Sequence, residues 1–185
     1  GLGFFKKTRV FPNPDFRGLT ALMVAAGQGY WQGINLLMEN GADIDAQADD
    51  GRTALSQAAY QGDVDTVAML LATGANPNIQ DNWGNTALML ATRTNQEKTA
   101  SNEAKDQGEL KIVSLLLRKG AKPNVQNHDG DTATMQAARK GNKDVVALLI
   151  KHGADLNVKN NVGFTALKSA RNNEVAALLI KHGAV

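Results

Sequence analysis

The sequence predicts an all-α solenoid, a row of short helix pairs joined by loops. One observation is the motif Gly-x-Thr-Ala, which recurs five times along the 185 residues. Another is a run of three apolar residues followed, after two more, by Gly-Ala, which recurs five times in register with the first motif. Apolar residues at helical spacing connect the two motifs. One such unit is too small to bury its apolar face, so we expect stacked neighbours to form the core.

The spacing of the two motifs defines the units. The first motif begins at Gly18, Gly51, Gly84, Gly130 and Gly163, which gives steps of 33, 33, 46 and 33 residues. The second motif ends at Gly41-Ala42, Gly74-Ala75, Gly120-Ala121, Gly153-Ala154 and Gly183-Ala184. We therefore expect an N-terminal segment at 1–17 and a repeat domain at 18–185. Its repeats are expected at 18–50, 51–83, 84–129, 130–162 and 163–185.

The second unit illustrates the local structure that each repeat predicts. The hydroxyl of Thr53 can cap a helix N-terminus, which predicts a first helix over Ala54–Tyr60. Gly62 ends this helix, because glycine adopts the left-handed conformation without strain. A second helix is expected over Asp63–Thr73, and the Asn-, Asp- and Pro-rich segment Ala75–Trp83 predicts an extended loop with a tight turn.

These features resemble the ankyrin repeat, most clearly in Gly51–Trp83 and Gly130–Val162. The shared pattern is Gly-x-Thr-Ala-Leu, an Ala-Ala pair, a leucine-rich second helix and Gly-Ala-Asp before an Asn/Asp loop. The resemblance implies antiparallel helix pairs with β-hairpin-like fingers at a right angle to them. It also implies protein binding through the finger tips and the concave face of the first helices, without catalysis. The family's Thr-Pro-Leu-His is replaced here, for example by Thr-Ala-Leu-Ser at Thr53–Ser56.

Two repeats differ in length from the others. The third has thirteen extra residues at Asn95–Gln107, nearly all polar and placed between its two helices. We interpret this insertion as a solvated loop or a helix extended by one or two turns, with a binding loop as the alternative. The fifth repeat is three residues short at Ala170–Glu174. Its polar residues suit a terminal capping repeat: Lys168, Arg171, Asn172, Asn173, Glu174 and Lys181.

The N-terminal segment carries no full repeat. Val10–Arg17 is consistent with the finger that would precede the first repeat. Leu2, Phe4 and Phe5 are expected to cover the apolar side of that repeat, although a preceding repeat would explain the same residues. The chain begins with Gly1, as expected of a processed form or of part of a longer chain. The compartment stays open between the cytoplasm and, if a signal peptide preceded Gly1, the periplasm or an exported state.

Composition argues against several classes of function. Charged residues make up 21% with both signs interspersed, and the net charge is only +2, which gives no electrostatic basis for a nucleic-acid partner. The chain lacks a run of about 18 apolar residues that would span a membrane. It has no cysteine, which excludes disulfides, thiolate nucleophiles and thiolate metal ligands.

The remaining candidates for chemistry have structural explanations. His152 and His182 occupy equivalent sites at the end of second helices, where an imidazolium complements the helix dipole. Equivalent sites in stacked repeats lie roughly 10 Å apart, too far to share a metal. The pair Asp49-Asp50 is on a finger, which offers no shielded pocket for acid–base work. We therefore expect no catalytic, cofactor or metal site.

The finger positions beside each motif glycine are the candidate protein-binding residues. Phe16, Trp83 and Phe164 are large and apolar at solvent-facing turns, and Tyr60 follows a first helix on the same concave side. Tyr30 and Trp31, in contrast, are expected to pack in the core. The full candidate set is Phe16, Arg17, Asp49, Asp50, Arg52, Tyr60, Asn82, Trp83, Asn85, His128, Asp129, Asp131 and Phe164.

Three functions remain open at this stage. The first is a protein-binding module, monomeric by itself, that uses the concave face and finger tips. The second is a bacterial inhibitor or immunity protein that blocks a partner enzyme, with Asn95–Gln107 as the inserted plug. The third is a scaffold fragment of a larger chain.

Overall fold

The computed structural model describes residues 20–93 and 103–185, so Phe16, Arg17 and the rest of 1–19 lie outside it, as do residues 94–102. The described residues form ten α-helices and no strand, which confirms the all-α prediction. The first helices are α1 (Ala21–Gly27), α3 (Ala54–Gln61), α5 (Ala87–Thr92), α7 (Ala133–Lys140) and α9 (Ala166–Ser169). The second helices are α2 (Trp31–Glu39), α4 (Val64–Ala72), α6 (Glu103–Arg118), α8 (Lys143–Lys151) and α10 (Asn173–Lys181).

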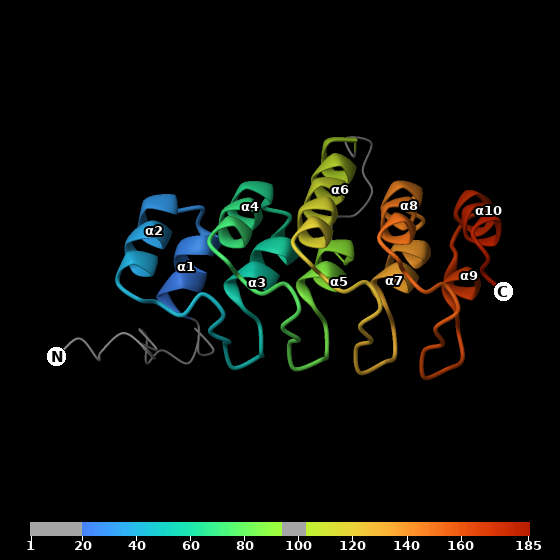
Figure 1. The fold of residues 1–185 in the computed structure, drawn as a ribbon, viewed down its shortest axis with the longest axis horizontal. Coiled ribbons are helices and arrows are strands. Elements are labelled where there is room, and N and C mark those ends of the chain that lie inside the picture. The colour runs from blue at the N-terminus through green and yellow to red at the C-terminus, as the bar shows by residue number, and fades with distance from the viewer. Residues whose placement is uncertain (1–19, 94–102) are drawn as a thin grey trace.

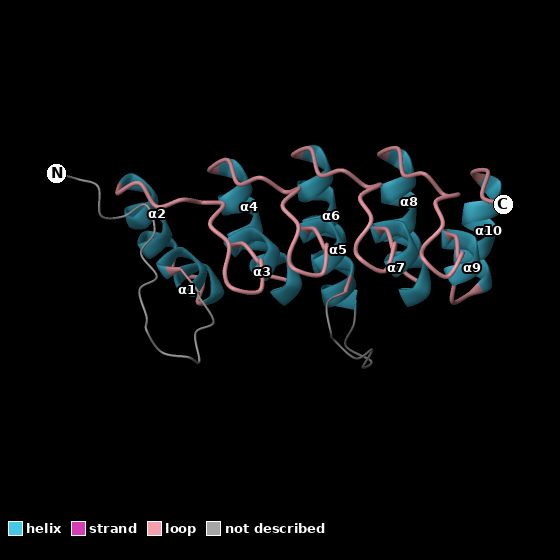
Figure 2. Ribbon diagram, turned by 90° about the horizontal axis from the view of Figure 1, so that it is seen from below, coloured by secondary structure: helices cyan, strands magenta, loops and turns pink. Residues whose placement is uncertain are grey.

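The helix pairs stand side by side in chain order, as expected for a solenoid. Figure 1 shows the second helices in an upper row, the first helices in a lower row and the loops between pairs projecting below. Figure 2, seen from below, shows the same two rows with the projecting loops spaced regularly along the array. The loops act as hairpin-like fingers, although none forms a regular strand within the described residues.

The predicted capping chemistry sets the start of each first helix. A threonine hydroxyl accepts a hydrogen bond from the backbone N–H three residues later at Thr20, Thr53, Thr86, Thr132 and Thr165. Asp63, Asn142 and Asn172 cap second helices in the same way. Gly62 and Gly141 end first helices with φ of 78° and 80°, a conformation that favours glycine.

The core runs along the seam between the two rows of helices. In the second unit Leu55, Val67 and Leu70 are no more than 1% exposed. Each fully buried side chain of this size stabilises the fold by about 1.5–3 kcal/mol relative to exposure. Alanines such as Ala58 and Ala59, also buried, let the first helices of neighbouring units pack closely. The core is therefore continuous along the array and has no single centre.

The expectation that Tyr30 and Trp31 pack in the core is wrong. Their exposed fractions are 54% and 49%. Tyr30 occupies the N-cap position of α2 without capping it, and its ring lies directly over Gly33, where a Cβ would be only 2.3 Å from the ring. Tyr30 precedes α2 and Trp31 is its first residue, and both aromatic side chains remain at the surface.

Helix α6 accounts for part of the insertion. It has 16 residues, whereas α4 and α8 have nine, and the seven extra residues add about two helical turns. Residues 103–107 are therefore a helical extension, as one of the interpretations expected, and Figure 1 shows α6 projecting beyond its neighbours. Glu109, 4% exposed, joins α6 to α7 through Lys140, whose Nζ lies 2.7 Å from Glu109 Oε2.

The last unit is reduced. Helix α9 has only four residues, and the polar residues expected to cap the array are all exposed: Lys168, Arg171, Asn172, Asn173, Glu174 and Lys181. None of the described helices, of which α6 is the longest, combines the length and apolar character needed to cross a membrane.

Candidate protein-binding face

Each finger is a tight turn closed by backbone hydrogen bonds. In the second finger Asp81 N donates to Asn85 O at 2.9 Å, and Gly84 N donates to Asp81 O at 2.9 Å. Gly84 has φ of 78°, and a Cβ there would lie 2.9 Å from the backbone nitrogen of His128 on the next finger. A glycine is needed at this position both for the turn and for the close approach of the neighbouring finger.

Adjacent fingers are bonded to one another. The backbone N–H groups of Asn82, His128 and Asn161 each donate to the preceding finger, to the carbonyls of Asp50, Trp83 and Asp129, at 3.0 Å. The Asn82 side chain adds a second bond, from Nδ2 to Asp49 O at 2.8 Å. The finger tips therefore form one connected surface, in which the Trp83 carbonyl accepts from His128 of the next finger.

A ladder of exposed glutamines, which was not predicted from the sequence, connects neighbouring fingers. Gln47 Nε2 donates to Gly51 O in its own finger and to Gln80 O in the next, at 2.6 and 3.1 Å. Gln80 and Gln126 repeat the pattern one and two units later. The sequence signal for this ladder was the glutamine that recurs four residues before the motif glycine in three repeats.

Two candidate binding residues, Asn85 and Asp131, are buried and not part of the surface. They are 1% and 6% exposed. Asp131 accepts from Arg139 Nη2 at 3.0 Å and from Asn160 Nδ2 at 2.8 Å. Asn85 Nδ2 donates to Asp81, and Asn85 Oδ1 accepts from Asn127 Nδ2 at 3.1 Å. These hydrogen bonds hold both side chains in a polar layer beneath the finger surface.

A cluster on the predicted face consists of Arg52, Tyr60 and Trp83. The guanidinium carbon of Arg52 lies 4.9 Å from the Tyr60 ring centroid and 5.9 Å from that of Trp83, within the range of cation–π attraction. Trp83 is 53% exposed. These three residues come from two fingers and one helix end, and the fold brings them together.

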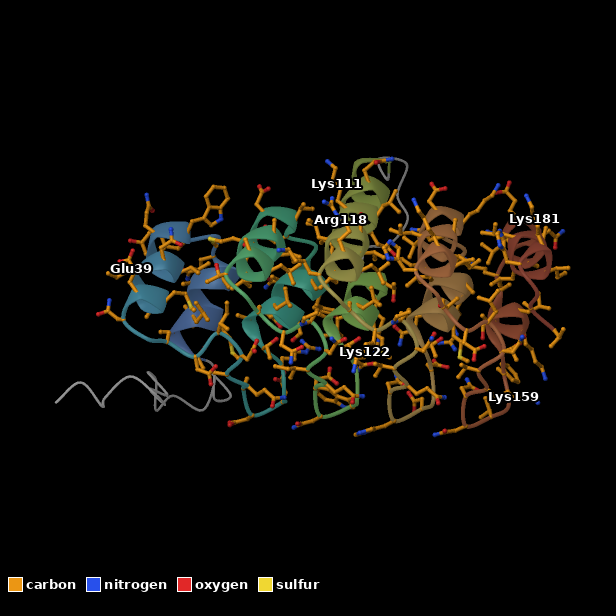
Figure 3. The ribbon with its side chains drawn as sticks, in the orientation of Figure 1. Glu39, Lys111, Arg118, Lys122, Lys159 and Lys181 are labelled. Atoms are coloured by element: carbon orange, nitrogen blue, oxygen red, sulfur yellow. The ribbon has the colours of Figure 1, made fainter. Side chains whose placement is uncertain are left out.

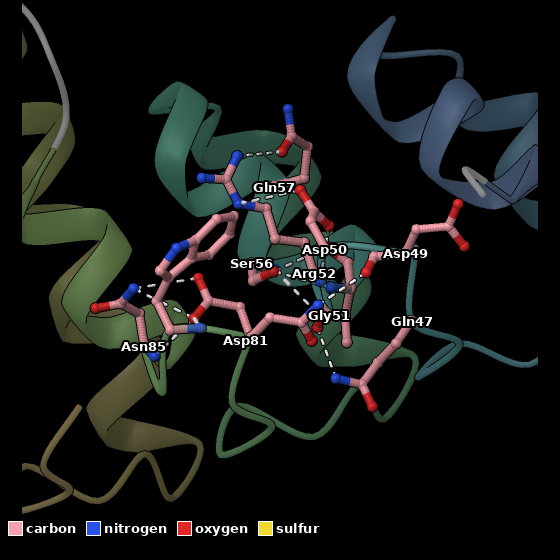
Figure 4. A network of polar contacts seen from close by, with 12 residues as sticks. Gln47, Asp49, Asp50, Gly51, Arg52, Ser56, Gln57, Asp81 and Asn85 are labelled. Carbon is pink, nitrogen blue, oxygen red and sulfur yellow. Dashed lines mark hydrogen bonds and ion pairs between the residues drawn. The ribbon is translucent and has the colours of Figure 1, made fainter. Parts of the chain in front are cut away.

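Polar contacts orient the Arg52 side chain further (Figure 4). Arg52 Nη1 donates to Gln57 Oε1 at 3.3 Å. Arg52 Nε lies 3.8 Å from Asp50 Oδ2, which is an ion-pair distance and too long for a hydrogen bond. Asp50 also accepts from the Arg52 backbone N–H, so that the finger turn and the guanidinium are positioned together.

Corresponding positions in the next two units carry arginine. Arg93 and Arg139 occupy the helix-end position of Tyr60, and both are exposed. Arg93 Nη1 donates to Asn85 Oδ1 at 3.4 Å, as Arg139 does to Asp131. In the last unit Lys168 Nζ lies 4.4 Å from the centroid of the half-exposed Phe164 ring. We call the surface formed by Arg52, Tyr60, Trp83, Arg93, Arg139, Phe164 and Lys168 the inner face.

The other candidates lie at the finger tips. Asp49, Asn82, His128 and Asp129 are exposed there. Arg93 and Arg139 were not predicted, and Lys168 was expected only to cap the array. The sequence did contain a signal for the two arginines. Each lies nine residues after its motif glycine, the same repeat position as Tyr60.

The histidines outside the fingers have the predicted place at helix ends. His152 and His182 are the C-cap residues of α8 and α10, and their backbone N–H groups bond to the preceding turn. Across residues 20–93 and 103–185, no three side chains of His, Cys, Asp or Glu gather in a group that could hold a metal ion.

A sequence model of the protein family described as "Ankyrin repeats (3 copies)" matches residues 22–102 and 100–185. The chain belongs to the ankyrin-repeat family. A comparison with curated proteins gives no match. Ankyrin repeats are in general protein-binding modules, and the family is typically non-catalytic. The family model describes three copies, whereas the described residues hold five helix pairs, so the repeat boundaries remain a prediction.

Proposed function

We propose that this ankyrin array binds a partner protein through the inner face and the finger tips, and does not catalyse a reaction. The proposal rests on Trp83, which combines an exposed side chain with a backbone held by hydrogen bonds. Its side chain is about half exposed at 53%, while its backbone is bonded to Asp81 within its finger and to His128 on the next. An aromatic side chain on a fixed backbone loses little conformational freedom on binding and is a typical interface anchor.

The neighbours of Trp83 support the same role. Arg52 and Tyr60 are half-buried beside it, and Arg, Tyr and Trp are the residue types that contribute most to protein interfaces. Asp49, His128 and Asp129 surround the cluster at the finger tips and would supply polar contacts at its rim. Asn85 and Asp131 act indirectly in this proposal, because they hold Arg93 and Arg139 in position.

The test compares capture of proteins by four immobilised forms of the chain: the wild type, Trp83→Ala, Tyr60→Ala and Trp31→Ala. Trp31 is the matched control, since it is 49% exposed but lies on α2, away from the fingers. We expect the wild type and Trp31→Ala to retain the same protein, quantified by mass spectrometry, and the other two variants to lose most of it. Equal retention by all four forms would refute this face as the binding site.

A further inference from the structure

The inner face carries a positive charge in each of the last four units. Arg52, Arg93, Arg139 and Lys168 stand there, one from each unit. Two of these charges are offset by carboxylates, since Asp50 lies beside Arg52 and Asp131 beside Arg139. The contacts of Arg93 and Lys168 are the neutral amide of Asn85 and the Phe164 ring. The inner face therefore has a net positive charge among the residues that define it.

The positive charge of the inner face does not simply reflect the net charge of the chain around it. Residues 20–93 contain eight acidic and only two basic residues, and the two basic ones are Arg52 and Arg93. Both therefore lie on the inner face of an otherwise acidic region. Residues 107–185 contain twelve basic and six acidic residues, so this region is basic overall. Residues 20–93 have a negative net charge, but their part of the inner face is positive because both of their arginines lie on it.

The guanidinium groups are oriented before any partner arrives. The acceptor of Arg93 is Asn85, which is fixed by Asp81 and by Asn127 from the next finger. The acceptor of Arg139 is Asp131, which is fixed by a bond from Asn160 Nδ2. Arginine presents a planar set of donors that matches a carboxylate, and pre-orientation lowers the entropic cost of using it.

We infer that the segment recognised by the inner face is an extended acidic peptide, with carboxylates spaced about three residues apart. This inference rests on the proposed function and specifies its partner. Packed helices lie about 8–10 Å apart, which sets the spacing between Arg93 and Arg139, the two cations at equivalent positions of neighbouring units. A polyproline-II chain, which is extended, rises about 3.1 Å per residue with three residues per turn, so every third side chain lies on the same face and meets the next unit. An apolar residue beside this acidic series would contact Trp83 and Tyr60.

The experiment is a selection of phage-displayed random 16-residue peptides on the wild-type chain. The expected result is enrichment of peptides with negative net charge and with Asp or Glu at i and i+3. Binding of a selected peptide, followed by fluorescence anisotropy, should weaken at least about tenfold in the Arg93→Glu, Lys168→Glu double variant. It should also weaken as salt is raised, because these side chains are exposed to screening.

A control double variant carries the same change in charge elsewhere. Lys111→Glu and Lys181→Glu alter exposed residues of α6 and α10, which Figure 3 shows in the row of second helices, away from the fingers. We expect less than about a threefold effect from this pair, because exposed charges at a distance are screened. If the reversed inner-face variant melts early, the neutral pair Arg93→Gln and Lys168→Gln should still weaken binding, by a smaller factor.

The outcomes separate this inference from the proposed function. Enrichment of neutral or basic peptides that lose affinity in Trp83→Ala would overturn the acidic inference and leave the inner face as the binding site. Equal weakening by the inner-face and control pairs would also overturn it. If the selection enriches no peptide, the inference of a linear acidic segment is contradicted. The proposed function, binding of a partner protein, would then apply to a folded partner. Enriched peptides insensitive both to Trp83→Ala and to the Arg93→Glu, Lys168→Glu double variant would contradict both proposals.

Discussion

Arg139 donates through Nη2 to Asp131 Oδ2 at 3.0 Å, and the same two repeat positions hold Arg93 with Asn85 in the preceding unit. One unit earlier they hold Tyr60 with Arg52, in contact through the ring and the guanidinium. The residue after the motif glycine therefore contacts the end of its own first helix in three successive units. This pairing fixes the side chains of the inner face from below.

Replacing Asp131 by alanine is expected to lower the free energy of unfolding by about 1–3 kcal/mol, because a buried acceptor is removed from Asn160 and Arg139. Asp129→Ala on the same finger is the matched control, since Asp129 is exposed, and its effect should stay within about 0.5 kcal/mol. Urea unfolding of both variants measures the difference. Equal effects would mean that the buried position has no structural role.

The burial of Asp131 and Asn85 shows which part of the face the sequence could predict. The helices, caps and turns follow from chemistry within one unit, such as the hydroxyl of Thr53 or the left-handed Gly62, so they were predicted correctly. Which side of a finger a side chain occupies depends on contacts between units, and no single repeat encodes them. For this reason Asn85 and Asp131 were predicted at the surface, whereas they are buried.

Gly62 and Gly108 occupy the same repeat position once the thirteen extra residues of the third repeat are set aside, and they are expected to respond in opposite directions to alanine. Gly62 has φ of 78°, where a Cβ adds strain, so Gly62→Ala should destabilise the chain by about 1–2 kcal/mol. Gly108 lies inside α6, and a Cβ there would be in ordinary contact with Val64 Cγ2 at 3.9 Å. Alanine at this position should stabilise α6 by about 0.5–1 kcal/mol. Melting curves test both, and destabilisation by Gly108→Ala would argue that the extended helix is not formed.

Loss of one step of the glutamine ladder should loosen two fingers at once. Gln80 Nε2 bonds to Gly84 O and to Gln126 O, so Gln80→Ala removes a contact within its finger and one to the next. We expect about 1 kcal/mol of destabilisation and faster hydrogen exchange at the amides of Gly84 and His128. Gln32→Ala, at an exposed site on α2, serves as control. Unchanged exchange at both amides would show that the ladder does not hold the fingers together.

The central claim is that the fold presents Trp83 as the main anchor of a protein-binding face. The most direct test is titration calorimetry of the captured partner against Trp83→Ala and Trp31→Ala, whose wild-type side chains are similarly exposed, at 53% and 49%. Loss of an interface anchor costs about 2 kcal/mol or more, so Trp83→Ala should raise Kd roughly 30-fold, while Trp31→Ala stays within about twofold. An equal Kd for the two variants, or a larger loss for Trp31→Ala, would contradict the claim.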